Sequence, residues 1–306
     1  MRGAGPKNCG RPVFARSIDF FQGLSAPWRM RFPFFVRTTA CLFLALLPFS
    51  LVARENLAVG WTNNMLTISS PDMPGGAIAI NYLEAFCRSG STQQKWEKTI
   101  IPHRTELLEL VKPGRHLRLR SRVEGGVEVT HDIHSHGDYV ELNLVATNSS
   151  DQAVDVQWFQ PCMRVDRFTG LKQENYFSKC FIVTAQGISW LDHLPRNEEA
   201  IYHGGQVYVP AGVNTNDVNP RPLSATRPVN GLIGAVSFDG RYVLGNAWDS
   251  TQELFPGVIV CVHNDPRIGG LQPHQTKKLR GRIYLMQSTP EKLVKRYERD
   301  FKPARR

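Results

Sequence analysis

The sequence predicts an all-β protein, a large antiparallel β-sandwich with one C-terminal α-helix. Apolar and polar residues alternate in three consecutive segments, 127–133, 140–146 and 154–162, which is typical of half-buried strands. Clusters rich in Gly, Asn, Asp and Ser separate these segments at 136–138 and 148–151, as turns do. One strong helix signal follows late in the chain. Many strands with a single late helix favour a sandwich.

About fifteen strands are expected in all, because strand and turn signals recur at short spacing. Beyond the three opening segments, strands are predicted at 65–69, 77–86, 105–111, 116–123, 176–184, 188–191, 232–238, 242–248, 258–263 and 277–286. Pro, Asn and Gly dominate residues 195–230, where we expect a long functional loop. Thr289, Pro290 and Glu291 open a helix predicted over 289–301. Its apolar stripe should dock against the sheet and close an edge.

The front of the 306-residue chain predicts export. Residues 1–53 hold seven Lys or Arg and one acid, so only +4 of the net charge of +10 belongs to the remainder. The apolar run 38–52 follows Arg31 and Arg37, as in a signal peptide, and is too short for a comfortable membrane span. We therefore expect an untranslated or disordered extension at 1–29, translation from Met30, and a signal peptide at 30–53. An uncleaved anchor is the alternative.

A single β-sandwich domain is then predicted over 54–306, secreted or periplasmic, with no stable membrane span after cleavage. Its charges are interspersed rather than clustered on one face, which disfavours nucleic acid as a partner.

Four cysteines lie behind the predicted signal peptide: Cys87, Cys162, Cys180 and Cys261. In an exported domain they predict up to two disulfides, and Cys162–Cys180 is the preferred pair because these residues flank one loop. The alternative is that all four are small buried hydrophobic residues. No CxxC spacing occurs, which disfavours a structural zinc site.

Histidines gather at the first turn of the opening strands. Asp132, His134 and His136 share one strand face, a pattern that can bind a divalent metal. The group runs into a turn on the face opposite the apolar one, so a solvated edge is favoured, and we predict neither a metal nor another cofactor. His131 points with the apolar residues and is predicted to be a core histidine.

A candidate sugar site follows the third opening strand. Trp158, Gln160, Arg164 and Asp166 recur at alternate positions. A flat aromatic face beside planar Arg and other polar groups suits a sugar ring and its hydroxyls. The alternative is an Arg–Asp ion pair that pins the loop.

Residues 260–270 form the other dense polar cluster. Cys261 and His263 share a strand face, and His263 and Asp265 could act as acid and base. Trp248 and Glu253 precede them. The alternative is a turn started by Asp265 and Pro266 and capped by Arg267. The sequence contains no nucleophile elbow, no phosphate-binding Gly loop and no HExxH, which disfavours serine-hydrolase, nucleotide-binding and zincin functions.

Three stretches resemble the galactose mutarotase-like (aldose epimerase-like) β-supersandwich family. They are LEAFCRSGSTQQKW (83–96), VATNSSDQAVDVQWFQPCMRV (145–165) and GVIVCVHNDPRIGGLQPHQTKKLRGRIYL (257–285). They correspond to the family's polar loop ending on Trp, its asparagine turn with the next strand, and its last two strands with the turn between them. The resemblance implies the fold and an affinity for sugars.

The family's catalytic residues are not matched. No His occurs in 87–96 or in 159–161, and Cys261 or His263 stands where the resemblance implies a catalytic Glu. Proton transfer at an anomeric carbon needs a paired acid and base, so ordinary mutarotase activity is not expected.

The sequence therefore favours an exported carbohydrate-binding protein, with acidic sugars among the candidate ligands. The first alternative is an enzyme, an epimerase or polysaccharide lyase, with His263 or His203 as base and Asp265 as a further catalytic residue. The second is a structural cell-envelope protein that uses 195–230 as a contact and has no cleft beside it. The expected pocket consists of Arg88, Trp158, Arg164, Asp166, His193, His203, Trp248, His263 and Arg267.

Overall fold

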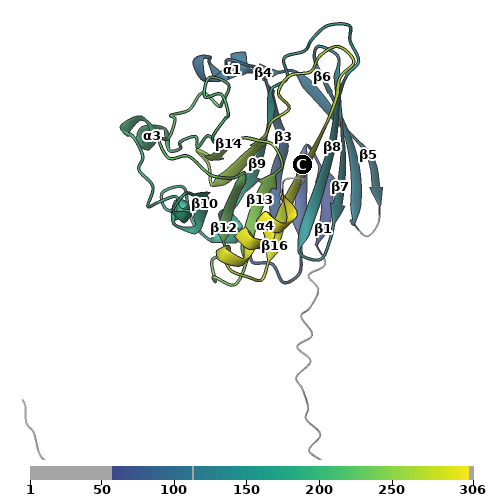
Figure 1. Ribbon diagram of the computed structural model, residues 1–306. Helices are drawn as coiled ribbons and strands as arrows, with labels where there is room; N and C mark the ends of the chain where they lie inside the picture. Colours follow the sequence, from purple (N-terminus) through teal and green to yellow (C-terminus); the bar gives the residue numbers. More distant parts are fainter. Residues whose placement is uncertain (1–56, 112–113, 303–306) are drawn as a thin grey trace, which may run out of the picture. The chain divides into compact units, whose positions relative to one another are not determined.

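A computed structural model describes residues 57–111 and 114–302, which fold as two antiparallel sheets (Figure 1). The first sheet runs in the order β1 (Ala58–Thr62), β2 (Met65–Ser69), β3 (Ala77–Cys87), β9 (Trp158–Arg164), β15 (Cys261–Pro266) and β14 (Thr251–Pro256), and β4 (Ile100–Ile101) pairs with β3. The second runs β11 (Gly187–Trp190), β10 (Cys180–Thr184), β12 (Leu232–Val236), β13 (Val243–Trp248), β16 (Thr276–Met286), β8 (Tyr139–Asn148), β7 (Val127–Ser135), β6 (His116–Val123) and β5 (His103–Val111). The predicted all-β sandwich is confirmed.

The main hydrophobic core lies between the two sheets. Val129 and Ile133 of β7 and Leu142 of β8 are buried in it, and every second residue of these strands is more exposed, as the alternation predicted. From the seven-stranded sheet, Phe159 and Met163 of β9 enter the same core. The third opening strand is shorter than expected, because Val154 makes only an isolated bridge to Leu271. Because Phe159 and Met163 point into the core, the other face of β9 carries Trp158, Gln160 and Cys162.

His131 is a core histidine, as predicted. Its Nδ1 lies 3.3 Å from the Tyr82 hydroxyl and its Nε2 lies 3.1 Å from the Ser121 hydroxyl, so both ring nitrogens have partners. Burial lowers the pKa of His131 to about 3. The ring is therefore neutral at ordinary pH and links the two sheets.

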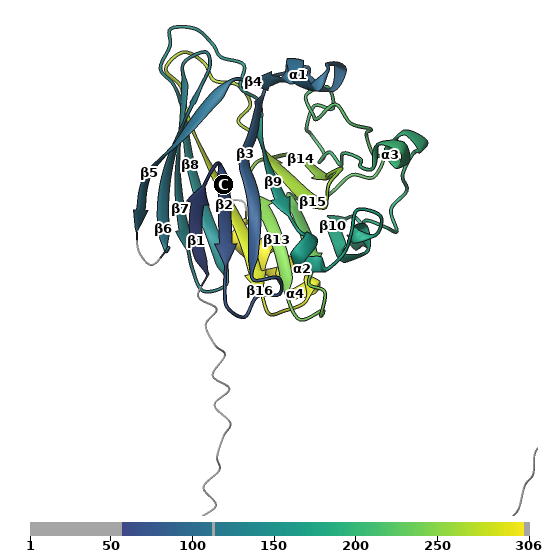
Figure 2. The same ribbon diagram turned by 180° about the vertical axis from the view of Figure 1, so that it is seen from behind.

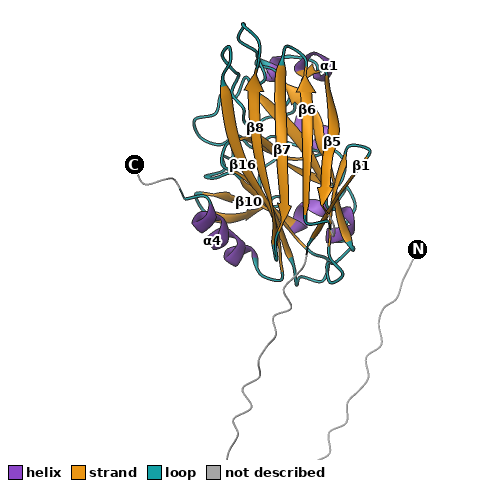
Figure 3. Ribbon diagram, turned by 90° about the vertical axis from the view of Figure 1, so that its right-hand side faces the viewer, coloured by secondary structure: helices purple, strands orange, loops and turns teal. Residues whose placement is uncertain are grey.

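The C-terminal helix α4 (Pro290–Asp300) packs against the face of the nine-stranded sheet, as Figure 3 shows. Leu293, Val294, Tyr297 and Phe301 contact a second apolar cluster built on β10, β12, β13 and β16. The helix was expected to close a sheet edge, and that expectation is wrong. β12, β13 and β16 lie inside the sheet, and Leu293 fits over Gly245 of β13, where a side chain would clash.

The long segment 195–230 covers the outer face of the seven-stranded sheet beside β14, as Figures 1 and 2 show. It carries α3 (Glu198–His203), and Tyr208 pairs with Leu254 of β14. Val207, Val209 and Val218 bury apolar area against Phe255. The remaining helices are short: η1 (Ser91–Gln93), α1 (Trp96–Thr99), α2 (Asp166–Thr169) and η2 (Tyr176–Lys179). No helix within 57–111 and 114–302 is long and apolar enough to cross a membrane.

Candidate functional site

A cleft of about 480 Å³ lies on the face of the seven-stranded sheet that points away from the sandwich core. Its floor comes from β9 and β15 and its sides come from the segment around α1, from 219–221 and from the turn at 257–259. It is lined by Glu84, Gln94, Lys95, Trp96, Glu97, Gln160, Cys162, Asn219, Pro220, Arg221, Phe255, Gly257, Val258, Ile259, Cys261 and His263. The same alternation that buries Phe159 and Val262 in the core turns their neighbours toward this cleft.

Hydrogen bonds between side chains and the backbone hold two sides of the cleft together. The Thr92 hydroxyl donates to the carbonyl of Thr215, and the Gly90 N–H donates to the Asp217 carboxylate. The Gln252 side chain donates to the carbonyl of Asp217, which ties the long segment to β14. These bonds fix the position of Asn219 and Arg221 relative to the sheet.

A chain of polar side chains runs along the floor. The Gln160 amide donates to the Glu84 carboxylate at 2.9 Å, and the Asn219 amide donates to the Gln160 oxygen at 2.9 Å. The backbone N–H of Asn219 donates to Glu253 Oε2 at 2.8 Å. Because each group orients the next, Gln160 and Asn219 present fixed hydrogen-bonding atoms to the cleft.

Beside the floor, farther along the same strands, lie two buried carboxyl groups, Glu253 of β14 and Asp265 of β15, which are opposite each other in the strand pair. Burial raises the pKa of Glu253 to about 7. Burial, followed by the charge of Glu253, raises the pKa of Asp265 well above its usual range. Glu253 Oε1 and both Asp265 oxygens accept no hydrogen bond from other side chains or the backbone. Two adjacent buried carboxyls cannot both ionise, so the pair retains at least one proton at neutral pH.

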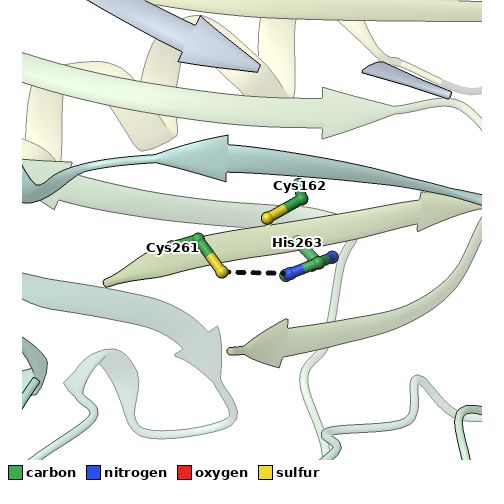
Figure 4. Close-up of side chains that lie close together, drawn as sticks. All are labelled: Cys162, Cys261 and His263. Carbon is green, nitrogen blue, oxygen red and sulfur yellow. Dashed lines mark hydrogen bonds between the residues drawn. The ribbon is translucent and has the colours of Figure 1, made fainter. Parts of the chain in front are cut away.

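Cys162, Cys261 and His263 meet on the cleft floor (Figure 4). Cys261 and His263 share one face of β15, as predicted, and Cys261 Sγ lies 3.2 Å from His263 Nε2. Cys162 extends from the neighbouring strand, β9. A hydrogen bond with Cys261, followed by burial, raises the pKa of the Cys162 thiol.

All four described cysteines are free and buried. The expected Cys162–Cys180 disulfide is therefore wrong, and the alternative of small buried residues holds for Cys87 and Cys180. Cys180 lies on β10 of the nine-stranded sheet, whereas Cys162 projects toward the cleft from the seven-stranded sheet. Cys162 lies close to Cys261 instead.

The structure does not bring the expected pocket residues together. His263 lines the cleft, and Asp265 is buried next to it on the same face of β15. Trp158 is buried on the cleft side of β9 and is covered by Trp96, whose ring lies 6.5 Å from its own. Trp248 is buried in the core against Phe159.

The remaining expected residues lie outside the cleft. Arg88 lines a separate depression beside Ile101 and donates to the carbonyl of Ile100. Arg164 and Asp166 line a shallow neighbouring depression, and Asp166 begins α2 where a loop was expected. His193 is exposed beside Asp192. Arg267 is half-buried and makes an isolated bridge to Trp158 of β9. The side chain of His203 falls outside the described residues, as do the predicted signal peptide and the extension before it.

Several residues of the cleft were not identified from the sequence. Phe255 lies on β14, which was not predicted, since both faces of that strand are covered and its burial does not alternate. Glu253, which was noted only as a carboxylate before the polar cluster, lies on the same strand. Asn219 and Arg221 lie in a segment without periodicity, and Glu84 and Trp96 are far from β15 in the sequence. The signal that was available is the unusual placement of Cys and His at alternate positions of an apolar strand.

The histidine cluster at the turn also differs from expectation. His116 Nε2 lies 2.6 Å and His134 Nε2 lies 3.0 Å from Asp132 Oδ1, and the two imidazoles stack. His136 instead stacks on Tyr139. The group is half-exposed, and the Asp132 carboxylate already contacts two histidines on this solvated face.

No family model matches the sequence, and no curated protein matches it. Solved structures give weak likenesses. An α-N-acetylgalactosaminidase, NagBb, from Bifidobacterium bifidum is 12% identical with a TM-score of 0.48, over 80% of this chain and 37% of that one. A galactose mutarotase-like protein from Lactobacillus casei is 10% identical with a TM-score of 0.40, over 75% of this chain and 100% of that one.

A galactose mutarotase related enzyme from Lactobacillus acidophilus is 9% identical, again with a TM-score of 0.40, over 76% of this chain and 98% of that one. Two of these three neighbours are thus named galactose mutarotase-like or galactose mutarotase related, at low similarity. This chain spans little more than a third of the length of the galactosaminidase.

Proposed function

We propose that the cleft binds a carbohydrate. The observation that carries this proposal is the ordered chain Glu84–Gln160–Asn219 on the floor of a cleft whose wall includes Trp96. Sugar sites combine oriented amides and carboxylates, which bond hydroxyls, with an aromatic face for the ring carbons. Trp96 is half-buried and rests on Trp158, so its ring is positioned before a ligand arrives.

Charges around the cleft favour a neutral sugar over an acidic one. Lys95 and Arg221 line it together with Glu84 and Glu97, so opposite charges balance. Arg164, which was expected to bind carboxylates, lies in the neighbouring depression. Uronic acids thus gain no net attraction at the cleft.

The test is a thermal-shift screen of the purified chain against neutral and uronic-acid oligosaccharides, followed by calorimetry of the best ligand. A ligand at a hundredfold its dissociation constant stabilises the protein by about 2.7 kcal/mol. Trp96→Ala should weaken binding about tenfold, and Trp96→Phe should retain most of it, since the stacking face remains. Arg88→Ala is the control, because Arg88 lines another depression. If no sugar gives a saturable shift, the proposal is refuted.

Catalysis is a second candidate because His263 lines the cleft 3.8 Å from Asp265, one of two buried acids whose pKa values are raised. His263 and Asp265 could then exchange protons with a bound sugar, as an epimerase or lyase requires. Chromatography of the best ligand after incubation would detect a new product. A product that disappears in His263→Gln, while binding remains, would establish this function.

We also propose that the protein is exported after cleavage near residue 53. The apolar run behind basic residues supports this, and N-terminal sequencing of the mature protein tests it. A structural role in the cell envelope is less well supported. That alternative expects no cleft beside 195–230, whereas Asn219 and Arg221 of this segment line one.

A further inference from the structure

Three side chains on the cleft floor have the composition of a soft-metal site. Cys162 Sγ, Cys261 Sγ and one His263 ring nitrogen all lie within 4.8 Å of one another. Figure 4 shows them side by side on β9 and β15. Around a tetrahedral zinc ion, thiolate and imidazole ligand atoms lie about 3.5 to 3.8 Å apart, from Zn–S and Zn–N bonds of about 2.3 and 2.0 Å. The three atoms therefore need only small side-chain movements to bind one ion.

The surroundings of His263 supply a second, independent observation. His263 is 2% exposed, yet its Nδ1 has no hydrogen-bond partner among the described residues, and Asp265 Oδ1 lies 3.8 Å away. Metal-binding histidines usually donate their other ring N–H to a carboxylate, which orients the ring. Asp265 stands where that partner is needed, and a small rotation of the ring toward the ion would shorten this contact.

Gly257 keeps the space above the ligands open. A Cβ atom at this position would collide with Cys261 Sγ and would lie 3.2 Å from His263 Nε2. The Gly257 carbonyl is held by the Tyr176 hydroxyl at 2.6 Å, so the backbone is fixed beside the cluster. All three ligands also line the cleft, which leaves a fourth coordination position facing its interior.

We propose that Cys162, Cys261 and His263 form a Zn²⁺ site whose fourth position opens into the cleft. Binding releases the two thiol protons to solvent, since zinc is held by thiolates. Three protein ligands with one open position are the arrangement of catalytic rather than structural zinc. The site does not depend on the ligand proposed for the cleft. The half-exposed group of His116, Asp132 and His134 contains no thiol and gives a spectroscopic contrast.

The experiment is a cobalt titration of the full chain after reduction and treatment with a chelator. One equivalent of Co²⁺ should produce a thiolate-to-cobalt charge-transfer band and the strong visible bands of tetrahedral cobalt, and Zn²⁺ should abolish both. Wild-type spectra alone decide whether a thiolate site exists. Absence of the charge-transfer band, or an intact mass of the native protein that shows a Cys162–Cys261 disulfide, would overturn the proposal.

Variants then locate the site. Cys162→Ser and Cys261→Ser should each remove most of the band, and Cys180→Ser is the matched control because Cys180 is buried outside the cluster. Gly257→Ala retains all three ligand residues but its Cβ collides with Cys261 Sγ, so it should weaken Co²⁺ binding at least about tenfold. His116→Gln should leave the band unchanged. A band that persists in Cys162→Ser, Cys261→Ser and Gly257→Ala would place the metal elsewhere.

Discussion

His131 and His263 are both buried histidines on strands, but their surroundings differ. Both ring nitrogens of His131 have hydroxyl partners, Tyr82 and Ser121, inside the sandwich core. His263 lies on the cleft floor, with Nε2 beside a thiol and Nδ1 without a hydrogen bond. A hydrogen-bonded buried polar group stabilises the fold, whereas a buried polar atom without a partner lowers the free energy of unfolding. Such an atom beside a cleft therefore needs an explanation other than stability. The contrast separates a structural histidine from a candidate functional one.

The largest expected effect is on stability. His131→Ala should lower the free energy of unfolding by about 3 kcal/mol or more, because it leaves a cavity and a buried Tyr82 hydroxyl without a partner, while Ser121 keeps its bond to Thr105. His263→Ala should cost only about 1 kcal/mol in reduced, metal-free protein, since fewer bonds are lost. Urea unfolding at neutral pH measures both. Equal losses for the two variants would contradict the contrast.

The two buried acids beside the cleft floor, Glu253 and Asp265, should lower the free energy of unfolding at high pH. The pKa of Glu253 is raised from 4.5 to about 7 in the folded protein, so folding retains a proton that the unfolded chain releases. Its contribution is full below pH 4.5 and is lost as the pH rises to about 7. Glu253→Gln should therefore be more stable than wild type at pH 8, by about 1 to 3 kcal/mol, with no gain at pH 4. Unfolding curves at both pH values test this.

Glu97→Gln, at the exposed rim, is the control for Glu253→Gln and should change the stability little at either pH.

His131 gives the opposite dependence of stability on pH. Its pKa is lowered from 6.5 to about 3, so stability falls as the pH drops below 6.5, by at most about 1.4 kcal/mol per pH unit. His131→Gln should reduce this acid slope without altering the slope between pH 7 and 8. A wild-type stability that rises steadily through pH 8 would be incompatible with the raised pKa values of Glu253 and Asp265.

The surface cluster should have the smallest effect. His134 and Asp132 are about 38% and 48% exposed, and solvent-exposed ion pairs contribute little. His134→Gln should lower the free energy of unfolding by less than about 0.5 kcal/mol at pH 6. Its loss should diminish further in high salt, because screening weakens exposed pairs. A loss as large as that of His131→Ala would show that this cluster is structural.

Sequence patterns predicted the parts of the fold that repeat locally. Period-two alternation located β7 and β8, because one face of each is buried and the other is not. It missed β14, where Gln252 and Glu253 are both buried, since a strand covered on both faces shows no alternation. The helix α4 was predicted from its stripe, but its docking surface was not, because that depends on which strands become neighbours.

For the site, the sequence by itself determined that Cys261 and His263 share one face of a strand, since alternate residues of a strand point the same way. The structure extends this strand to Pro266 and so adds Asp265 to that face. Tertiary structure alone decided which residues join them. Cys162 reaches the cluster through the pairing of β9 with β15, Glu253 through the pairing of β14 with β15, and Asn219 through the long segment that covers the sheet. Aromatic and Arg residues near these positions in the chain, such as Trp248 and Arg88, lie elsewhere. The physical reason is that contacts between distant strands follow from how the whole core packs, which no local spacing records.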